Sequence, residues 1–163
     1  MMPRAPLLVL VPLDGSPLAE LALPHAALLA KRLPSRLLLL RVNPEIGGGL
    51  DPYTMRRLAE EDGAVARAYL AEQQRKLAEI GVGAEGVVRV GEPVSAISDV
   101  IRERGVAFVV MTTHGRSGLQ RAFFGSVADR LLRESPVPVM VVRPGQPLPA
   151  RYAHLATQVV ERP

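Results

Sequence analysis

Five short and largely apolar segments, of which the third is weaker than the others, constrain the fold of this chain more than any other feature of its sequence. They are too short for most helices and are rich in branched side chains. Unbroken apolar runs are typical of strands that are buried on both faces, as in parallel sheets. The strands are expected at about 7–13, 36–42, 85–90, 106–112 and 138–142.

Helix signals separate these runs. Ser16 offers an N-cap and Pro17 a first helical residue, and the helix that they begin is expected to end at Pro34. The helices are expected at about 17–34, 52–80, 94–101 and 126–134. Strands that alternate with helices predict a single doubly wound α/β domain, in which helices cover both faces of a parallel sheet.

The composition restricts the classes of function. The chain has no Cys, which excludes disulfide frameworks and thiolate zinc sites and fits a cytoplasmic protein. No apolar run is long enough to span a bilayer. The net charge of +4 admits an anionic ligand, but aromatic residues make up only 4% of the chain, too few to form a stacking platform for single-stranded nucleic acid. We therefore expect neither nucleic acid nor membrane as a partner.

The stretch HGRSGLQRAFFGS, from His114 to Ser126, is the strongest candidate for a binding site. It follows the apolar run at 106–112 and leads into a helix, so free backbone N–H groups and the positive end of the helix dipole gather there and favour an anion. Its glycines allow the backbone to approach phosphate oxygens closely. Ser126 can cap the helix, bind a terminal phosphate or do both. A surface loop with Ser126 as an ordinary N-cap is the alternative.

Asp14 is the second candidate, because it ends the first strand. In a doubly wound sheet whose chain doubles back after the third strand, the first and fourth strands are neighbours, and ligands bind in the crevice between their loops. Asp14 then faces the stretch from His114 to Ser126. A carboxylate in that place suits ribose hydroxyls or a bridging metal. The alternative is a turn-forming Asp before Gly15.

Other motifs are interpreted as structural. GVGAEG at 81–86 matches G-x-G-x-x-G, but it leaves a helix and enters a strand, which is the reverse of the order that a dinucleotide site needs. It predicts a helix cap and a turn. His25 is expected to pack in an apolar helix stripe, and His114 to orient its loop rather than act as a base. No Ser-His-Asp order, H-E-x-x-H pattern or Walker lysine indicates catalysis.

Four ordered motifs resemble those of the universal stress protein family. They are VPLDGS at 11–16, THGRSG at 113–118, GSVADRLL at 125–132 and PVPVMVVR at 136–143. The resemblance covers about 7–143 and implies a five-stranded sheet in the order 3-2-1-4-5 and a homodimer built through the last strand, Pro138–Val142. We expect a domain of this kind at 1–145, followed at 146–163 by a tail that is a short helix or disordered.

The ATP-binding branch of the family carries G-x2-G-x9-G-[ST] after the fourth strand. In this sequence the spacing of nine fits only Gly115 to Gly125, so the first glycine of the motif falls on Thr112. A β-branched residue resists positive φ and puts a side chain near the phosphates, although at a strand end its hydroxyl can donate. The resemblance implies ATP, with or without Mg²⁺ held through its phosphates and with no direct metal ligand. It implies these contacts: Pro12 and Asp14 near the ribose, Val42 at the adenine, and Met111, Thr112, Gly115, Arg116, Gly125, Ser126 and Val127 around the phosphates.

The sequence therefore predicts a cytoplasmic, dimeric stress-response protein that binds ATP and acts as a binding or signalling module rather than as an enzyme. A dimeric module of the same fold that has lost nucleotide binding is the alternative, and Thr112 favours it. A slow ATP hydrolase or adenylyl transferase is the third reading, limited by the lack of a positioned base or lysine.

Overall fold

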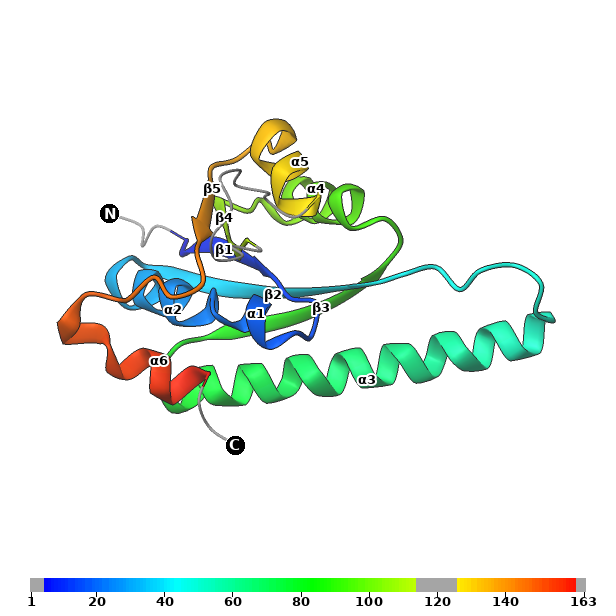
Figure 1. Cartoon of the computed structure of the whole chain (residues 1–163), viewed down its shortest axis with the longest axis horizontal. Coiled ribbons are helices and arrows are strands. Elements are labelled where there is room, and N and C mark those ends of the chain that lie inside the picture. Colours follow the sequence, from blue (N-terminus) through cyan, green and yellow to red (C-terminus); the bar gives the residue numbers. More distant parts are fainter. Residues whose placement is uncertain (1–4, 114–125, 161–163) are drawn as a thin grey trace.

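The computed structural model describes residues 5–113 and 126–160, and a parallel sheet lies at its centre (Figure 1). The strands are β1 (Leu7–Pro12), β2 (Ser35–Asn43), β3 (Ala84–Val90), β4 (Phe108–Thr112) and β5 (Val139–Val142). The five-stranded sheet has the order β3-β2-β1-β4-β5, and every neighbouring pair is parallel. The predicted fold class and strand order are confirmed.

Helices cover both faces of this sheet, as the alternating pattern predicts (Figure 1). They are α1 (Pro17–Glu20), α2 (Leu23–Arg32), α3 (Pro52–Glu79), α4 (Pro93–Arg104), α5 (Ser126–Glu134) and α6 (His154–Val159), with a 3-10 helix at Ala150–Tyr152. One face carries α1, α2, α3 and α6, and the other carries α4 and α5. Among the described helices, none is long and apolar enough to cross a membrane.

The central strands bury both of their faces. In β1, Val9 and Val11 point into the core that α2 and α3 cover, whereas Leu10 points into the core that α4 and α5 cover. Residues Leu37–Leu40 of β2 alternate between the same two cores. All of these side chains are at most 1% exposed. Burial on both sides explains why these strands are unbroken apolar runs in the sequence.

The helix predicted from Pro17 to Pro34 is in fact two helices. The first, α1, ends at Glu20, and α2 begins only at Leu23. Pro24 prevents a continuous helix, because its ring has no N–H to donate to the carbonyl of Glu20 and clashes with that carbonyl. In the first turn of α2 the missing donor costs little, since no intrahelical partner exists there.

The segment after β5 packs against the helices of the first face. Leu155 and Val159 of α6 are fully buried, and Val159 belongs to the same core as residues of α2 and α3. The guanidinium group of Arg32 lies 4.8 Å from the centre of the Tyr152 ring, within range of a cation–π interaction. Figure 1 shows α6 next to the C-terminal end of α3.

Candidate functional site

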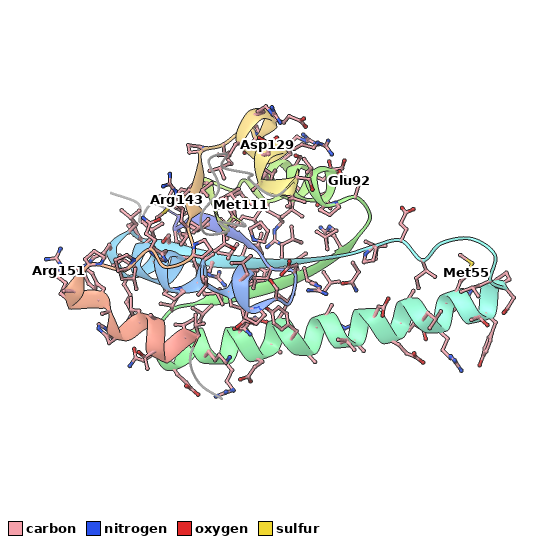
Figure 2. The ribbon with its side chains drawn as sticks, in the orientation of Figure 1. Met55, Glu92, Met111, Asp129, Arg143 and Arg151 are labelled. Atoms are coloured by element: carbon pink, nitrogen blue, oxygen red, sulfur yellow. The ribbon has the colours of Figure 1, made fainter. Side chains whose placement is uncertain are left out.

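A cavity of about 210 Å³ opens at the carboxyl ends of β1, β2 and β4. Its lining in the described part of the chain consists of Pro12, Leu13, Asp14, Ser16, Leu18, Ala19, Leu40, Val42, Pro93, Ile97, Met111, Thr112, Ser126, Val127 and Ala128. Met111, labelled in Figure 2, belongs to β4 and to the core that α4 and α5 cover. The strand order reverses here, because β2 and β3 lie on one side of β1 and β4 and β5 on the other. Open parallel sheets bind their ligands at such switch points.

Seven of the ten residues expected at a nucleotide lie on this lining. They are Pro12, Asp14, Val42, Met111, Thr112, Ser126 and Val127. The remaining three, Gly115, Arg116 and Gly125, lie outside the described residues. The fold thus brings together segments that are far apart in the sequence, while the part that each residue plays in binding remains a prediction.

The sequence did not single out the apolar wall that α4 adds to the cavity. Glu92 is the N-cap of this helix, and its carboxylate accepts from the backbone N–H groups of Val94 and Ser95 at 3.2 and 2.8 Å. The cap starts α4 at the carboxyl edge of the sheet, so Pro93 and Ile97 reach the cavity. The apolar stripe of this helix was visible in the sequence, but a stripe alone does not distinguish core from cavity wall.

Asp14 is held by a turn at the end of β1. The backbone N–H of Ser16 donates to Asp14 Oδ1 at 2.9 Å, and Ser16 Oγ accepts from the N–H of Ala19 at 3.1 Å, which caps α1. Gly15 has a φ of +83°, which bends the chain between them. Asp14 Oδ1 thus fixes the turn, and the carboxylate lies on the lining of the cavity.

Arg41 of β2 lies against this turn. A Cβ built on Gly15 would be 2.6 Å from Arg41 Nη1, so the guanidinium group contacts the glycine backbone. Partial burial by itself raises the pKa of Asp14, but hydrogen bonds from Ser16 and the charge of Arg41 outweigh it, and the pKa lies below its ordinary value. Asp14 is therefore ionised at neutral pH. The signal in the sequence was a charge inside an otherwise apolar run at 37–42.

A polar cluster links the loop after β1 to α3. The hydroxyl of Tyr69 donates to Glu20 Oε1 at 3.0 Å, and Gln73 Nε2 donates to the same oxygen at 3.3 Å. Burial and the charge of Glu20 raise the pKa of Tyr69, so its hydroxyl keeps its proton and remains a donor. Glu20 ends α1, and these bonds therefore hold the short helix that follows Ser16 against α3.

Thr112 meets no backbone conflict at the position of the motif's first glycine. It is the last residue of β4 and is paired with Val142 of β5. No described residue other than glycine has a positive φ, so a β-branched side chain fits the strand geometry of Thr112. Thr112 also lines the cavity.

The N-terminus of α5 forms another side of the cavity. Ser126 is its first residue, and Ser126, Val127 and Ala128 all belong to the lining. The first backbone N–H groups of a helix have no partner within the helix, and the helix dipole places partial positive charge there. The cavity therefore combines apolar strand residues, the carboxylate of Asp14 and an electropositive helix end.

The sequence model of the universal stress protein family matches residues 8–143, which include the sheet from Leu8 onward and the described lining of the cavity. The chain belongs to this family. The family resemblance of the four motifs is thereby confirmed. The universal stress protein YxiE of Bacillus subtilis is 31% identical over an alignment of 147 positions, and the alignment covers 83% of this chain and 97% of that protein.

Solved structures of universal stress proteins share the fold. The universal stress protein UspA from Lactobacillus plantarum has a TM-score of 0.72 at 22% identity, covering 86% of this chain and 100% of that chain. The universal stress protein from Archaeoglobus fulgidus, solved in complex with dAMP, has a TM-score of 0.62 at 24% identity, covering 86% of this chain and 98% of that chain.

The turn that holds Asp14 makes a prediction about stability. Gly15→Ala should lower the free energy of unfolding by about 1–2 kcal/mol, because alanine is strained at a φ of +83°. The end of the Arg41 side chain can move aside, so the backbone strain dominates. Gly47→Ala is the control, since nothing lies within 4 Å of its Cβ position, and it should change stability by less than about 1 kcal/mol. Urea unfolding measures both; equal effects would contradict the strain.

Proposed function

We propose that this universal stress protein acts in the cytoplasm as a dimeric, nucleotide-dependent binding or signalling module, and that it binds ATP in the cavity between β1, β4 and α5. The proposal rests on one observation: a single cavity combines apolar strand residues, the carboxylate of Asp14 and the N-terminus of α5. These three features complement the base, the ribose and the phosphates of a nucleotide. The relative from Archaeoglobus fulgidus in complex with dAMP supports an adenine nucleotide as the ligand.

The apolar part of the cavity suits the base and the ribose. Leu40, Val42 and Met111 offer apolar surface to an adenine ring. The carboxylate of the ionised Asp14 accepts hydrogen bonds from ribose hydroxyls. The volume of about 210 Å³ is below the range of about 300–1,000 Å³ for whole-ligand pockets. We therefore expect the cavity to enclose the nucleoside and the phosphates to lie at its rim.

In the proposed complex the phosphates lie at the N-terminus of α5. The hydroxyl of Ser126 and the N–H groups of the first turn donate to phosphate oxygens, and the helix dipole adds attraction. Gly115, Arg116 and Gly125 keep the phosphate roles that the family motif implies. Within residues 5–113 and 126–160, no group of three or more His, Asp or Glu residues is placed to hold a metal. Mg²⁺ would be held through the phosphates, and the role of the chain is to bind rather than to catalyse.

Ser126→Ala tests the phosphate contact. The variant should bind ATP about tenfold more weakly, because a hydrogen bond to a charged group contributes about 1.5–3 kcal/mol. Its affinity for adenosine, which has no phosphate, should stay unchanged. Thr157→Ala removes an exposed hydroxyl on α6, away from the cavity, and is the matched control. Calorimetric titrations at one salt concentration give all the affinities. A parent protein that binds no ATP at millimolar nucleotide would end the proposal.

Thr112→Gly separates ATP binding from the alternative of a module that has lost it. If the parent binds ATP, restoring the motif glycine should leave the affinity unchanged or lower it, since Thr112 already fits the strand. The alternative predicts that only the variant binds, because the threonine side chain lines the cavity and would then exclude the phosphates. Titration of parent and variant under the same conditions decides between the two.

The proposed dimer uses β5, the strand at the edge of the sheet. An edge strand presents a row of backbone N–H and C=O groups that can pair with another chain. Met140 is 37% exposed on β5 and supplies apolar surface next to those groups. This strand, Val139–Val142, lies within the predicted dimer segment Pro138–Val142.

Met140→Lys tests this edge against the opposite one. The lysine should raise the dissociation constant of the dimer at least about tenfold, because its charge would have to be desolvated at the seam. Val90→Lys, on the other edge strand β3, is the matched control, since Val90 is 63% exposed. Sedimentation equilibrium should find dimers for the parent and for Val90→Lys. A monomeric parent, or dissociation caused only by Val90→Lys, contradicts the assignment.

A further inference from the structure

The first half of α3, residues 52–65, projects past the sheet (Figure 1). The structure describes all of these residues, and none of them is buried. The buried residues of this helix begin only at Ala66. Met55, labelled in Figure 2 near the start of the helix, is half-buried. Residues 52–65, which we call the outer segment, therefore contribute little to the core of the domain.

Hydrogen bonds nevertheless hold the outer segment in place. Asp51 caps the helix, because its Oδ1 accepts from the backbone N–H groups of Tyr53 and Thr54 at 3.0 and 3.1 Å. Further along, Asn43 at the end of β2 donates through Nδ2 to the carbonyl oxygen of Asp62 at 3.1 Å. The outer segment is thus fixed near both of its ends, and its outward side is a preformed surface.

A row of exposed side chains runs along that outward side. Tyr53 and Val65 are 75% and 70% exposed. Between them, at the same spacing of four residues, lie Arg57 and Glu61, whose Nε and Oε1 atoms are 3.5 Å apart and whose side chains are both 61% exposed. Residues spaced by four form the ridges along which helices most often pack against each other, at a crossing angle of about 50°. The row therefore has the form of a packing ridge that no described part of the chain covers.

The order of side chains along this ridge complements itself. The ridge reads apolar, cation, anion, apolar. When two copies pair in antiparallel orientation about a two-fold axis at Ala59, Arg57 lies opposite the partner's Glu61, and Tyr53 lies opposite the partner's Val65. A two-fold axis repeats each of these contacts. Parallel pairing would instead place like charges together.

The stability of the helix itself does not explain this order of charges. An i,i+4 ion pair is more favourable when the glutamate precedes the cation, and here Arg57 precedes Glu61. The helix dipole favours anions near the N-terminus, yet the first turn of α3 contains no acidic residue. The neighbouring row has the same order, with Arg56 before Glu60. Pairing with a second copy accounts for an order that the isolated helix does not favour.

We propose that the outer segment of α3 is a docking surface for the outer segment of a second copy of this chain, in antiparallel orientation. Two short helical segments bury less than the roughly 1,200 Å² of a standard interface, so this association is weak and reversible. The proposal depends on neither ATP nor the β5 dimer, because the outer segment belongs to neither the described cavity lining nor β5. If the β5 dimer also forms, the outer segments join such dimers into larger assemblies.

Two charge reversals, Arg57→Glu and Glu61→Arg, test the pairing. Both are made in the full chain carrying Met140→Lys, which weakens pairing through β5. Each reversal alone should weaken self-association at least about tenfold, because like charges then face each other twice across the axis. A mixture of the two variants should associate at least as strongly as the unreversed chain, since one variant presents two anions and the other two cations. Sedimentation velocity, with one variant carrying a fluorescent label, measures each case.

Two controls separate pairing from a change in the helix. The double variant, with both reversals in one chain, should regain self-association. Arg102→Glu breaks an exposed pair within α4, where Arg102 Nη2 lies 2.6 Å from Asp99 Oδ1, and it should leave self-association unchanged. Circular dichroism should find the same helix content in all variants. An unreversed chain that stays monomeric at high concentration, reversals without effect, or single variants that fail to associate when mixed would overturn the proposal.

Discussion

The burial of β1 and β2 on both faces is the constraint on which the rest of this structure depends. Successive residues of each strand belong to different cores, so the two layers of helices are locked to one sheet and to each other. Removing one such leucine side chain typically costs about 2–5 kcal/mol. The chain that leaves β1 leads to α1 on one face of the sheet, whereas α5 lies on the other face. The cavity beside Asp14 lies between these two helices, at the carboxyl edge of the sheet.

Most of the fold could be predicted from the sequence, because burial on both faces leaves a local signal. The short apolar segments, together with the weaker one at 85–90, identified all five strands. Their order rested on the family resemblance, since no local pattern states which strands pair. The break between α1 and α2 was missed because apolar periodicity continues through Pro24, and the missing N–H of that residue decided the outcome. The packing of the tail could not be read, because Leu155 and Val159 are buried only by contacts with distant helices.

The site was predictable where its residues belong to strand ends and motifs, as Asp14 and Ser126 do. It was not predictable where distant segments combine. Glu20 and Tyr69 are 49 positions apart, yet they share the hydrogen bond that holds α1 against α3. Arg41 stood out in the sequence only as a charge, and its contact with Gly15 needs the register of β1 and β2. Ile97 follows a normal core pattern while also forming a cavity wall.

The burial of α6 determines which part of the chain folds together as one unit. Val159 sits in one core with Val9 and Leu39, although the family match stops at residue 143. A chain shortened at that limit would uncover apolar surface on α2 and α3 that the parent hides. The segment that packs around one core is therefore longer than the segment that the family model matches.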